Sequence, residues 1–277
     1  MAGSLLLFTI LLPLSLGCIL AGIAFFTPAR AGLLAIATLA SILLVYYFLE
    51  GLPPFPPVSS KHKLFYIFVV LGMSALASQR IPRIPHLLLT FGLMLAALIW
   101  IGQRKIGVDP FQPEIFLGLL PVIGASVLTA SPRENRTDLF LWPSALITLA
   151  ISGSLVSILG GYIGLAQMLG AFAALLGGFL GIGYLTVHLL GRSATHLNIV
   201  GLNWLFMTAI TIILISIAIF ASKLSTVAFG LICLIYLSPF VAASFVGRPK
   251  WWVPFAMGGV SLVSALLAIA FAWAQSS

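Results

Sequence analysis

Long apolar runs fill most of the chain, and short charged or proline- and glycine-rich breaks separate them. A helix that crosses a hydrocarbon core of about 30 Å needs about 20 apolar residues. Cutting the sequence at its polar breaks therefore predicts an all-α, polytopic transmembrane helix bundle with short loops and no soluble domain. We expect about ten helices, with eight or nine as the alternative. The predicted helices cover residues 5–26, 31–49, 64–79, 86–102, 115–130, 140–159, 163–190, 199–221, 225–246 and 252–274.

Two parts of this prediction depend on local features. No Asp, Glu, Lys or Arg lies between Leu139 and Leu190, so this run must turn once. Gly160 and Gly161 offer a turn at low steric cost. The third, fourth and fifth predicted helices are only about 16 residues long, which is short for a complete crossing.

The most charged stretch, residues 131–138, lies at the midpoint of the chain. Five predicted helices precede it and five follow it. An odd number of helices in each half would make the halves antiparallel in the membrane, as in inverted-repeat transporters. We expect one integral membrane domain over residues 1–277, with 1–138 and 139–277 as pseudo-symmetric halves if the similar loop spacing reflects a repeat.

Composition supports a membrane protein and excludes several other classes. Hydrophobic residues make up 61% of the 277 positions and charged residues only 6%, whereas a soluble domain carries about 25% charged residues. The net charge of +8 comes from Lys and Arg that stand singly or in twos between apolar runs. This spacing is typical of loop anchors rather than of a nucleic-acid surface. We therefore expect a lipid bilayer as a partner and no nucleic acid.

The basic residues also indicate an orientation. Eight of them fall in the loops after odd-numbered predicted helices and five in the other loops. The positive-inside rule then places both termini outside the cytoplasm of a multi-pass protein, for which a bacterial inner membrane is the expected location. The first 26 residues lack the basic start of a signal peptide, so we expect them to remain as the first helix.

The sequence offers little chemistry inside the predicted helices. All five acidic residues lie at helix ends or in loops, and no metal-binding, nucleophile or phosphate-loop motif occurs. We therefore expect no enzyme activity, no metal and no cofactor. Glu114 and Asp109 share a loop with Arg104 and Lys105, which charge balance explains. His188 is a weak cofactor-binding candidate, since it lies in an apolar run, although an interfacial histidine is the simpler interpretation.

Three further groups of residues are candidates for packing, lining and anchoring. Closely spaced glycines in the sixth and seventh helices predict close helix contacts, and the small residues of the last helix form a similar line. Amides could line a cavity or satisfy backbone groups at a helix start, and a cation beside two indoles is typical of an interfacial anchor. The packing candidates are Gly160, Gly164, Gly177, Gly178 and Gly181, with Ser261, Ala265, Ala268 and Ala272; the lining candidates are Gln167, Asn198 and Asn203; the anchor candidates are Lys250, Trp251 and Trp252.

Two functional hypotheses follow. The first is a non-catalytic subunit or scaffold of a larger membrane complex, because small-residue faces and the proline-rich segment 50–57 could contact other membrane protein subunits. The alternative is a transporter of a neutral or lipophilic small molecule with a five-plus-five helix arrangement. Such a carrier needs only a polar-lined cavity and no intramembrane carboxylate.

Overall fold

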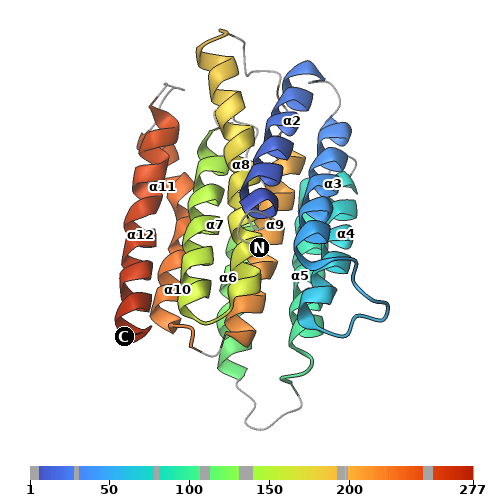
Figure 1. The fold of residues 1–277 in the computed structure, drawn as a ribbon, viewed down its shortest axis with the longest axis vertical. Coiled ribbons are helices and arrows are strands. Elements are labelled where there is room, and N and C mark those ends of the chain that lie inside the picture. The colour runs from blue at the N-terminus through green and yellow to red at the C-terminus, as the bar shows by residue number, and fades with distance from the viewer. Residues whose placement is uncertain are drawn as a thin grey trace.

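The computed structural model describes residues 6–27, 31–77, 81–106, 113–130, 140–191, 197, 199–221, 223–245 and 252–276, and all regular structure in these ranges is helical. Figure 1 shows the helices standing side by side, with most successive helices running in opposite directions along the bundle. The helices are η1 (Leu7–Leu11, a π-helical turn), α2 (Leu12–Phe26), α3 (Ala31–Glu50), α4 (Ser60–Ala77), α5 (Arg83–Gly102), α6 (Pro113–Ala130), α7 (Leu141–Leu159), α8 (Ile163–His188), α9 (Val200–Phe220), α10 (Thr226–Cys233), η2 (Leu234–Leu237, a 3₁₀ turn), α11 (Ser238–Phe245) and α12 (Val253–Ser276).

The all-α prediction is confirmed, and α10, η2 and α11 together occupy the ninth predicted segment. Seven helices in the described part of the chain are long and apolar enough to cross a membrane. These seven are compatible with an integral multi-pass membrane protein. The predicted turn also lies where expected, because α7 ends at Leu159 and α8 begins at Ile163. Gly161 in this turn has a φ of +80°, a conformation that glycine adopts without a Cβ penalty.

The three short predicted helices are longer than the sequence indicated, because helix continues through residues at which the segments were cut. α4 starts at Ser60 and includes Lys61 and Lys63 in its first turn. The ammonium of Lys63 donates to the carbonyl oxygen of Trp100 at 2.5 Å, so a buried cation is satisfied at the helix start. α5 accommodates Pro85 in its first turn, where an N–H has no helical partner.

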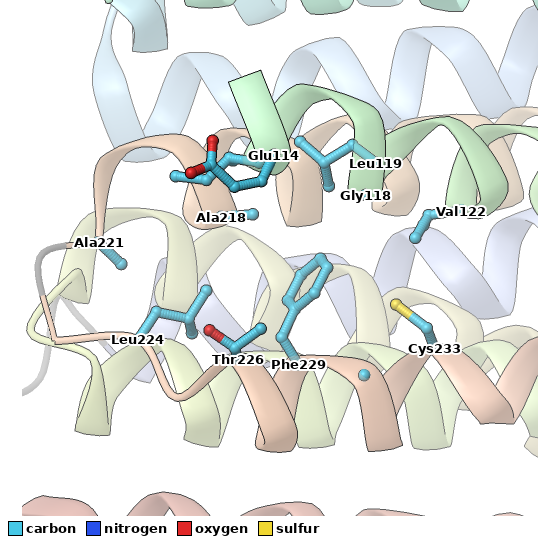
Figure 2. Close-up of a pocket in the computed structure, with 12 residues that line it drawn as sticks. Glu114, Gly118, Leu119, Val122, Ala218, Ala221, Leu224, Thr226, Phe229 and Cys233 are labelled. Atoms are coloured by element: carbon cyan, nitrogen blue, oxygen red, sulfur yellow. The ribbon is translucent and has the colours of Figure 1, made fainter. Parts of the chain in front are cut away.

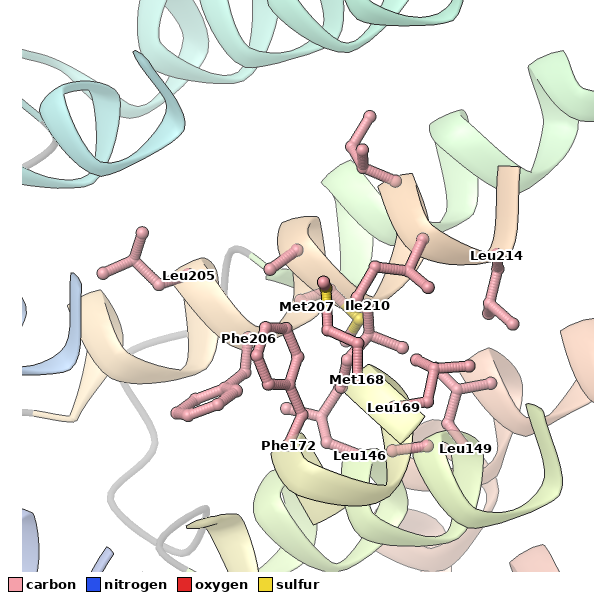
Figure 3. Packing of buried hydrophobic residues seen from close by; sticks show 14 of the residues in the cluster. Leu146, Leu149, Met168, Leu169, Phe172, Leu205, Phe206, Met207, Ile210 and Leu214 are labelled. Atoms are coloured by element: carbon pink, nitrogen blue, oxygen red, sulfur yellow. The ribbon is translucent and has the colours of Figure 1, made fainter. Parts of the chain in front are cut away.

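α9 is the central helix of the bundle. In its most apolar stretch of 18 residues, 94% of the residues are buried. The helix packs against α3, α4, α5, α6, α7 and α8. Figure 3 shows the core formed where α7, α8 and α9 meet, with Phe172 and Met168 of α8 facing Phe206 and Met207 of α9. In contrast, α12 lies at the edge of the bundle and packs against α7, α10 and α11.

The tightest contact between helices joins α2 and α8. A Cβ built on Gly178 would lie 2.2 Å from the carbonyl oxygen of Leu14, and one on Gly17 would lie 1.9 Å from the carbonyl oxygen of Leu175. Both distances are far below van der Waals contact, so the two backbones touch through paired glycines. Gly17 is a packing residue that the glycine spacing in α7 and α8 did not indicate.

Candidate functional site

A groove lies between α6 and α10, at the end of the bundle where both helices begin. α6 packs mainly against α9 and α5, whereas α10 packs mainly against α12 and α7. The last turn of α9 lies behind the space between them and forms its floor. The groove has a volume of about 540 Å³, which falls within the range of roughly 300–1,000 Å³ typical of small-molecule sites.

Apolar side chains form most of the lining. Figure 2 shows Leu119 and Val122 of α6 on one wall and Phe229 of α10 on the other, with Ala218 of α9 between them. Glycine on each wall adds room, because a Cβ on Gly118 or Gly230 would have no atom within 4 Å. The groove is lined by Glu114, Ile115, Gly118, Leu119, Val122, Ala218, Ala221, Leu224, Thr226, Phe229, Gly230 and Cys233.

The polar groups of the groove are separated along its length. The carboxylate of Glu114 and the hydroxyl of Thr226 lie toward the outer end, near the starts of α6 and α10. Cys233, the last residue of α10, lies at the inner end. The site therefore offers a negative charge at its mouth and an apolar channel behind it, which suits a molecule with a cationic head and an apolar body.

Glu114 has no ion-pair partner in the described part of the chain. The sequence predicts charge balance with Arg104 and Lys105, but the only ion pair that involves a carboxylate of the described residues joins Lys61 and Glu50 at 2.9 Å. Glu114 occupies the first turn of α6 and is exposed.

A second polar cluster lies inside the bundle, near the end of α4 and the start of α5. The Nε2 atom of His86 lies 3.0 Å from the carbonyl oxygen of Ser74 and 3.4 Å from its hydroxyl, which in turn lies 3.1 Å from the hydroxyl of Thr90. The ring of His86 packs on Trp204 of α9 with centroids 4.3 Å apart. The indole Nε1 of Trp204 is buried without a hydrogen-bond partner among the described residues.

Two of the predicted lining residues, Gln167 and Asn203, are not among the residues that line the groove. Asn203 is buried in the first turn of α9, and neither polar atom of its amide has a hydrogen-bond partner within the described ranges. Gln167 is half-buried on α8. Asn198 lies outside the described residues. Cavity lining by these amides stays a prediction.

The five predicted packing glycines have different surroundings. Gly178 makes the backbone contact with α2 described above, whereas a Cβ on Gly177 or Gly181 would meet no atom within 4 Å. A Cβ on Gly164 would lie 2.3 Å from the Nζ of Lys61, so this glycine makes room for the Lys61–Glu50 ion pair. Gly160 ends α7.

The remaining candidates lie at helix ends. His188, the last residue of α8, is exposed, and its ring packs on Phe140 and Tyr184 with centroid distances of 5.7 and 4.6 Å. The buried histidine is instead His86, which the sequence placed at the limit of a predicted segment. Trp252 directly precedes α12. Lys250 and Trp251 lie outside the described residues.

The sequence did not single out the groove residues, although one signal could have drawn attention to them. Glu114 was interpreted as part of a charged loop because it follows Arg104 and Lys105 within ten residues. However, Pro113 directly before it is a typical helix start. Placing Glu114 inside the first turn of α6 would have marked it as a carboxylate on an apolar helix.

The described residues form an all-helical bundle with seven helices long and apolar enough to cross a membrane, and with a groove between α6, α9 and α10. A comparison with models of known protein families found no match to this chain, and no curated protein sequence matches it either. Functional inference therefore depends on the geometry of the chain itself.

Proposed function

We propose that this protein is an integral membrane transporter of lipophilic small molecules, with a preference for cations. The groove between α6, α9 and α10 supports this function, because it combines a volume of about 540 Å³, apolar walls and the carboxylate of Glu114 at its mouth. An amphiphilic cation could keep its charged head near the carboxylate while its apolar part lies against Leu119 and Phe229.

Exposed side chains support placement in a membrane. Large apolar residues on the outer helices face away from the protein, among them Phe255, Leu266 and Trp273 of α12. In water such a surface would be a strong aggregation site. The bacterial inner membrane, and the orientation with both termini outside the cytoplasm, remain part of this proposal.

The structure gives less support to the subunit hypothesis, because surfaces that suggested it are used within the chain. The small residues Ser261, Ala265 and Ala268 of α12 are buried, and this helix packs against α7 and α10. The proline-rich loop packs on its own protein: a guanidinium nitrogen of Arg104 donates to the carbonyl of Val58, and Tyr66 donates to that of Pro54. Association with other subunits stays a prediction.

Uptake of ethidium by vesicles tests the proposed function. Ethidium is a lipophilic cation that becomes fluorescent on DNA, so vesicles with trapped DNA report its entry. The full-length protein should accelerate entry severalfold over empty vesicles. Glu114→Gln should remove most of this acceleration, because the neutral amide no longer attracts the cation.

Glu50→Gln is the matched control, since it removes a carboxylate that pairs with Lys61 and does not line the groove. This variant should transport ethidium like the parent. Ethidium should also slow the alkylation of Cys233 by N-ethylmaleimide, because both occupy the groove. Equal uptake by Glu114→Gln and the parent, without protection of Cys233, would contradict the assignment of the groove.

The particle mass in mild detergent separates transport from the subunit hypothesis. A particle containing one or two copies of this chain, active alone in vesicles, is expected. Stoichiometric partner proteins, together with no uptake by the isolated chain, would favour a subunit of a larger complex.

A further inference from the structure

The helix on one side of the groove is broken directly above the groove. α10 ends at Cys233, a 3₁₀ turn covers Leu234–Leu237, and α11 starts at Ser238. Pro239 accounts for the break, because it has no N–H to donate to the carbonyl of Ile235 and its ring would collide with that group in a continuous helix. The same carbonyl instead accepts from the backbone N–H of Ser238 and, at 2.6 Å, from the Ser238 hydroxyl.

The broken segment carries a tyrosine that is fixed to the central helix. The hydroxyl of Tyr236 lies 2.6 Å from that of Thr211 on α9, and both side chains are buried. Tyr236 follows the groove residue Cys233 by about one turn, and Thr211 precedes the groove residue Ala218 by seven residues, or about 10 Å along α9. The Tyr236–Thr211 pair therefore lies just beyond the inner end of the groove.

Beyond this pair, the same face of α9 continues toward the second polar cluster. Residues seven apart share a helix face, so Trp204, Thr211 and Ala218 lie in one line, with Thr208 close beside it. Trp204 packs on His86, and Thr208 is completely buried. Polar side chains on this face of α9 thus extend from the inner end of the groove toward the His86, Ser74 and Thr90 cluster, and the hydroxyls of Thr208 and Thr211 donate to carbonyl oxygens of α9 itself.

We propose that Tyr236 and Thr211 form the gate of the transport route, with the η2 turn as its hinge. In the closed state the tyrosine ring seals the inner end of the groove. Breaking the single hydrogen bond to Thr211 allows the segment at η2 to swing and connects the groove to the polar side chains on this face of α9. A 3₁₀ turn within a longer helix is a common location for such a hinge. This inference rests on the proposed function, since it names the gate of the same groove.

Cysteine reporters on the two sides of the pair test the gate without a substrate. The first reporter is native Cys233, in the groove, in a Cys18→Ser background. The second is Thr208→Cys, beyond the gate, with both native cysteines changed to serine. Each protein is placed in lipid nanodiscs, and the rate of alkylation by N-ethylmaleimide is measured.

In the parent, Cys233 should react faster than the Thr208→Cys thiol, because Cys233 lines the groove and position 208 is completely buried. Tyr236→Phe and Thr211→Val each remove the hydrogen bond while nearly preserving shape. Each should accelerate alkylation of the Thr208→Cys reporter about fivefold, the population shift expected from the loss of one hydrogen bond. The Cys233 rate should stay within about twofold of the parent, and the double variant should resemble either single variant because both break the same bond.

Three results would overturn the gate. An unchanged rate at the Thr208→Cys reporter in both variants would show that the pair does not control access. Equal acceleration at both reporters would indicate general loosening of the bundle. Multiplicative effects in the double variant would show that the two side chains act separately. Because no substrate is present in this test, none of these results bears on the ethidium uptake that tests the groove. If uptake fails but the Thr208→Cys reporter responds, the substrate assignment is wrong and the gate is supported.

Discussion

The contact of α2 with α8 and the groove between α6 and α10 use the same residue type for opposite purposes. Gly17 and Gly178 bring two backbones together until no Cβ fits between them. Gly118 and Gly230 instead face open space across the groove. Glycine therefore does not by itself indicate close packing, and the neighbouring helices decide whether the missing side chain becomes a contact or a cavity.

The two regions also differ in the continuity of their helices. α8 runs without a break from Ile163 to His188, and its close contacts leave no room for a separate movement of one half. Both walls of the groove are linked to a proline: Pro121 lies within α6, and Pro239 lies in the first turn of α11, which follows α10 and η2. We expect the packed region to hold the bundle together and the groove region to move.

The largest expected difference between the regions comes from removing one aromatic ring. Phe172 is fully buried, and its ring centroid lies about 6 Å from those of Phe68 and Phe206. Phe172→Ala should lower the free energy of unfolding by about 3 kcal/mol, because the lost ring leaves a cavity. Phe229→Ala, on the groove wall, should cost less than about 1 kcal/mol. Unfolding in detergent by SDS titration measures both losses of free energy. Equal losses in the two variants would show that the core and the groove wall do not differ in packing.

Adding one methyl group at two glycines of α8 should have opposite effects on stability. Gly→Ala in a helix normally stabilises a protein by about 0.5–1 kcal/mol, and Gly181→Ala should do so because its Cβ meets no atom. Gly178→Ala should instead destabilise by about 1–3 kcal/mol, because its Cβ would overlap the carbonyl of Leu14. The same SDS titration shows whether each substitution raises or lowers the free energy of unfolding. Stabilisation by both substitutions would show that α2 and α8 are not in backbone contact.

Restoring one backbone hydrogen bond should make the groove region resemble the packed one. Pro239→Ala supplies an N–H for the carbonyl of Ile235 and should extend α11 backward through η2, with a gain of about 1 kcal/mol in stability. It should also slow alkylation of the Thr208→Cys reporter and the uptake of ethidium. A faster reporter in this variant would contradict the role of η2 as a hinge.

The smallest expected effect on stability distinguishes two carboxylates at helix ends, Glu50 and Glu114. Glu50 and Lys61 form an ion pair whose side chains are 18% and 31% exposed, so Glu50→Gln should cost only about 0.5 kcal/mol. Glu114→Gln should leave stability unchanged, since Glu114 has no ion pair among the described residues, and should affect uptake alone. Thermal unfolding in detergent checks the first effect, and loss of folded Glu114→Gln protein would show that its carboxylate has a structural role.

The sequence by itself determined the helices and most of their limits. An apolar run of membrane length must satisfy its own backbone, so it becomes a helix whatever surrounds it. The turn at Gly160 and Gly161 follows from the same reasoning, because an uncharged run of that length cannot be one crossing. The start of α4 at Ser60 was missed, because the cations of Lys61 and Lys63 in its first turn are satisfied by Glu50 and by the carbonyl of Trp100, which come from other segments.

Only the tertiary structure decided which helix lies at the centre and where the bundle stays open. A leucine that faces lipid and a leucine that faces protein lie in equally apolar surroundings, so hydropathy cannot distinguish central α9 from peripheral α12. The position of Glu114 beside Phe229 and Cys233 likewise depends on α6 and α10 packing on different neighbours. The chain's local preferences specify helices, while the groove exists only because close approach in one part of the bundle leaves space unfilled in another.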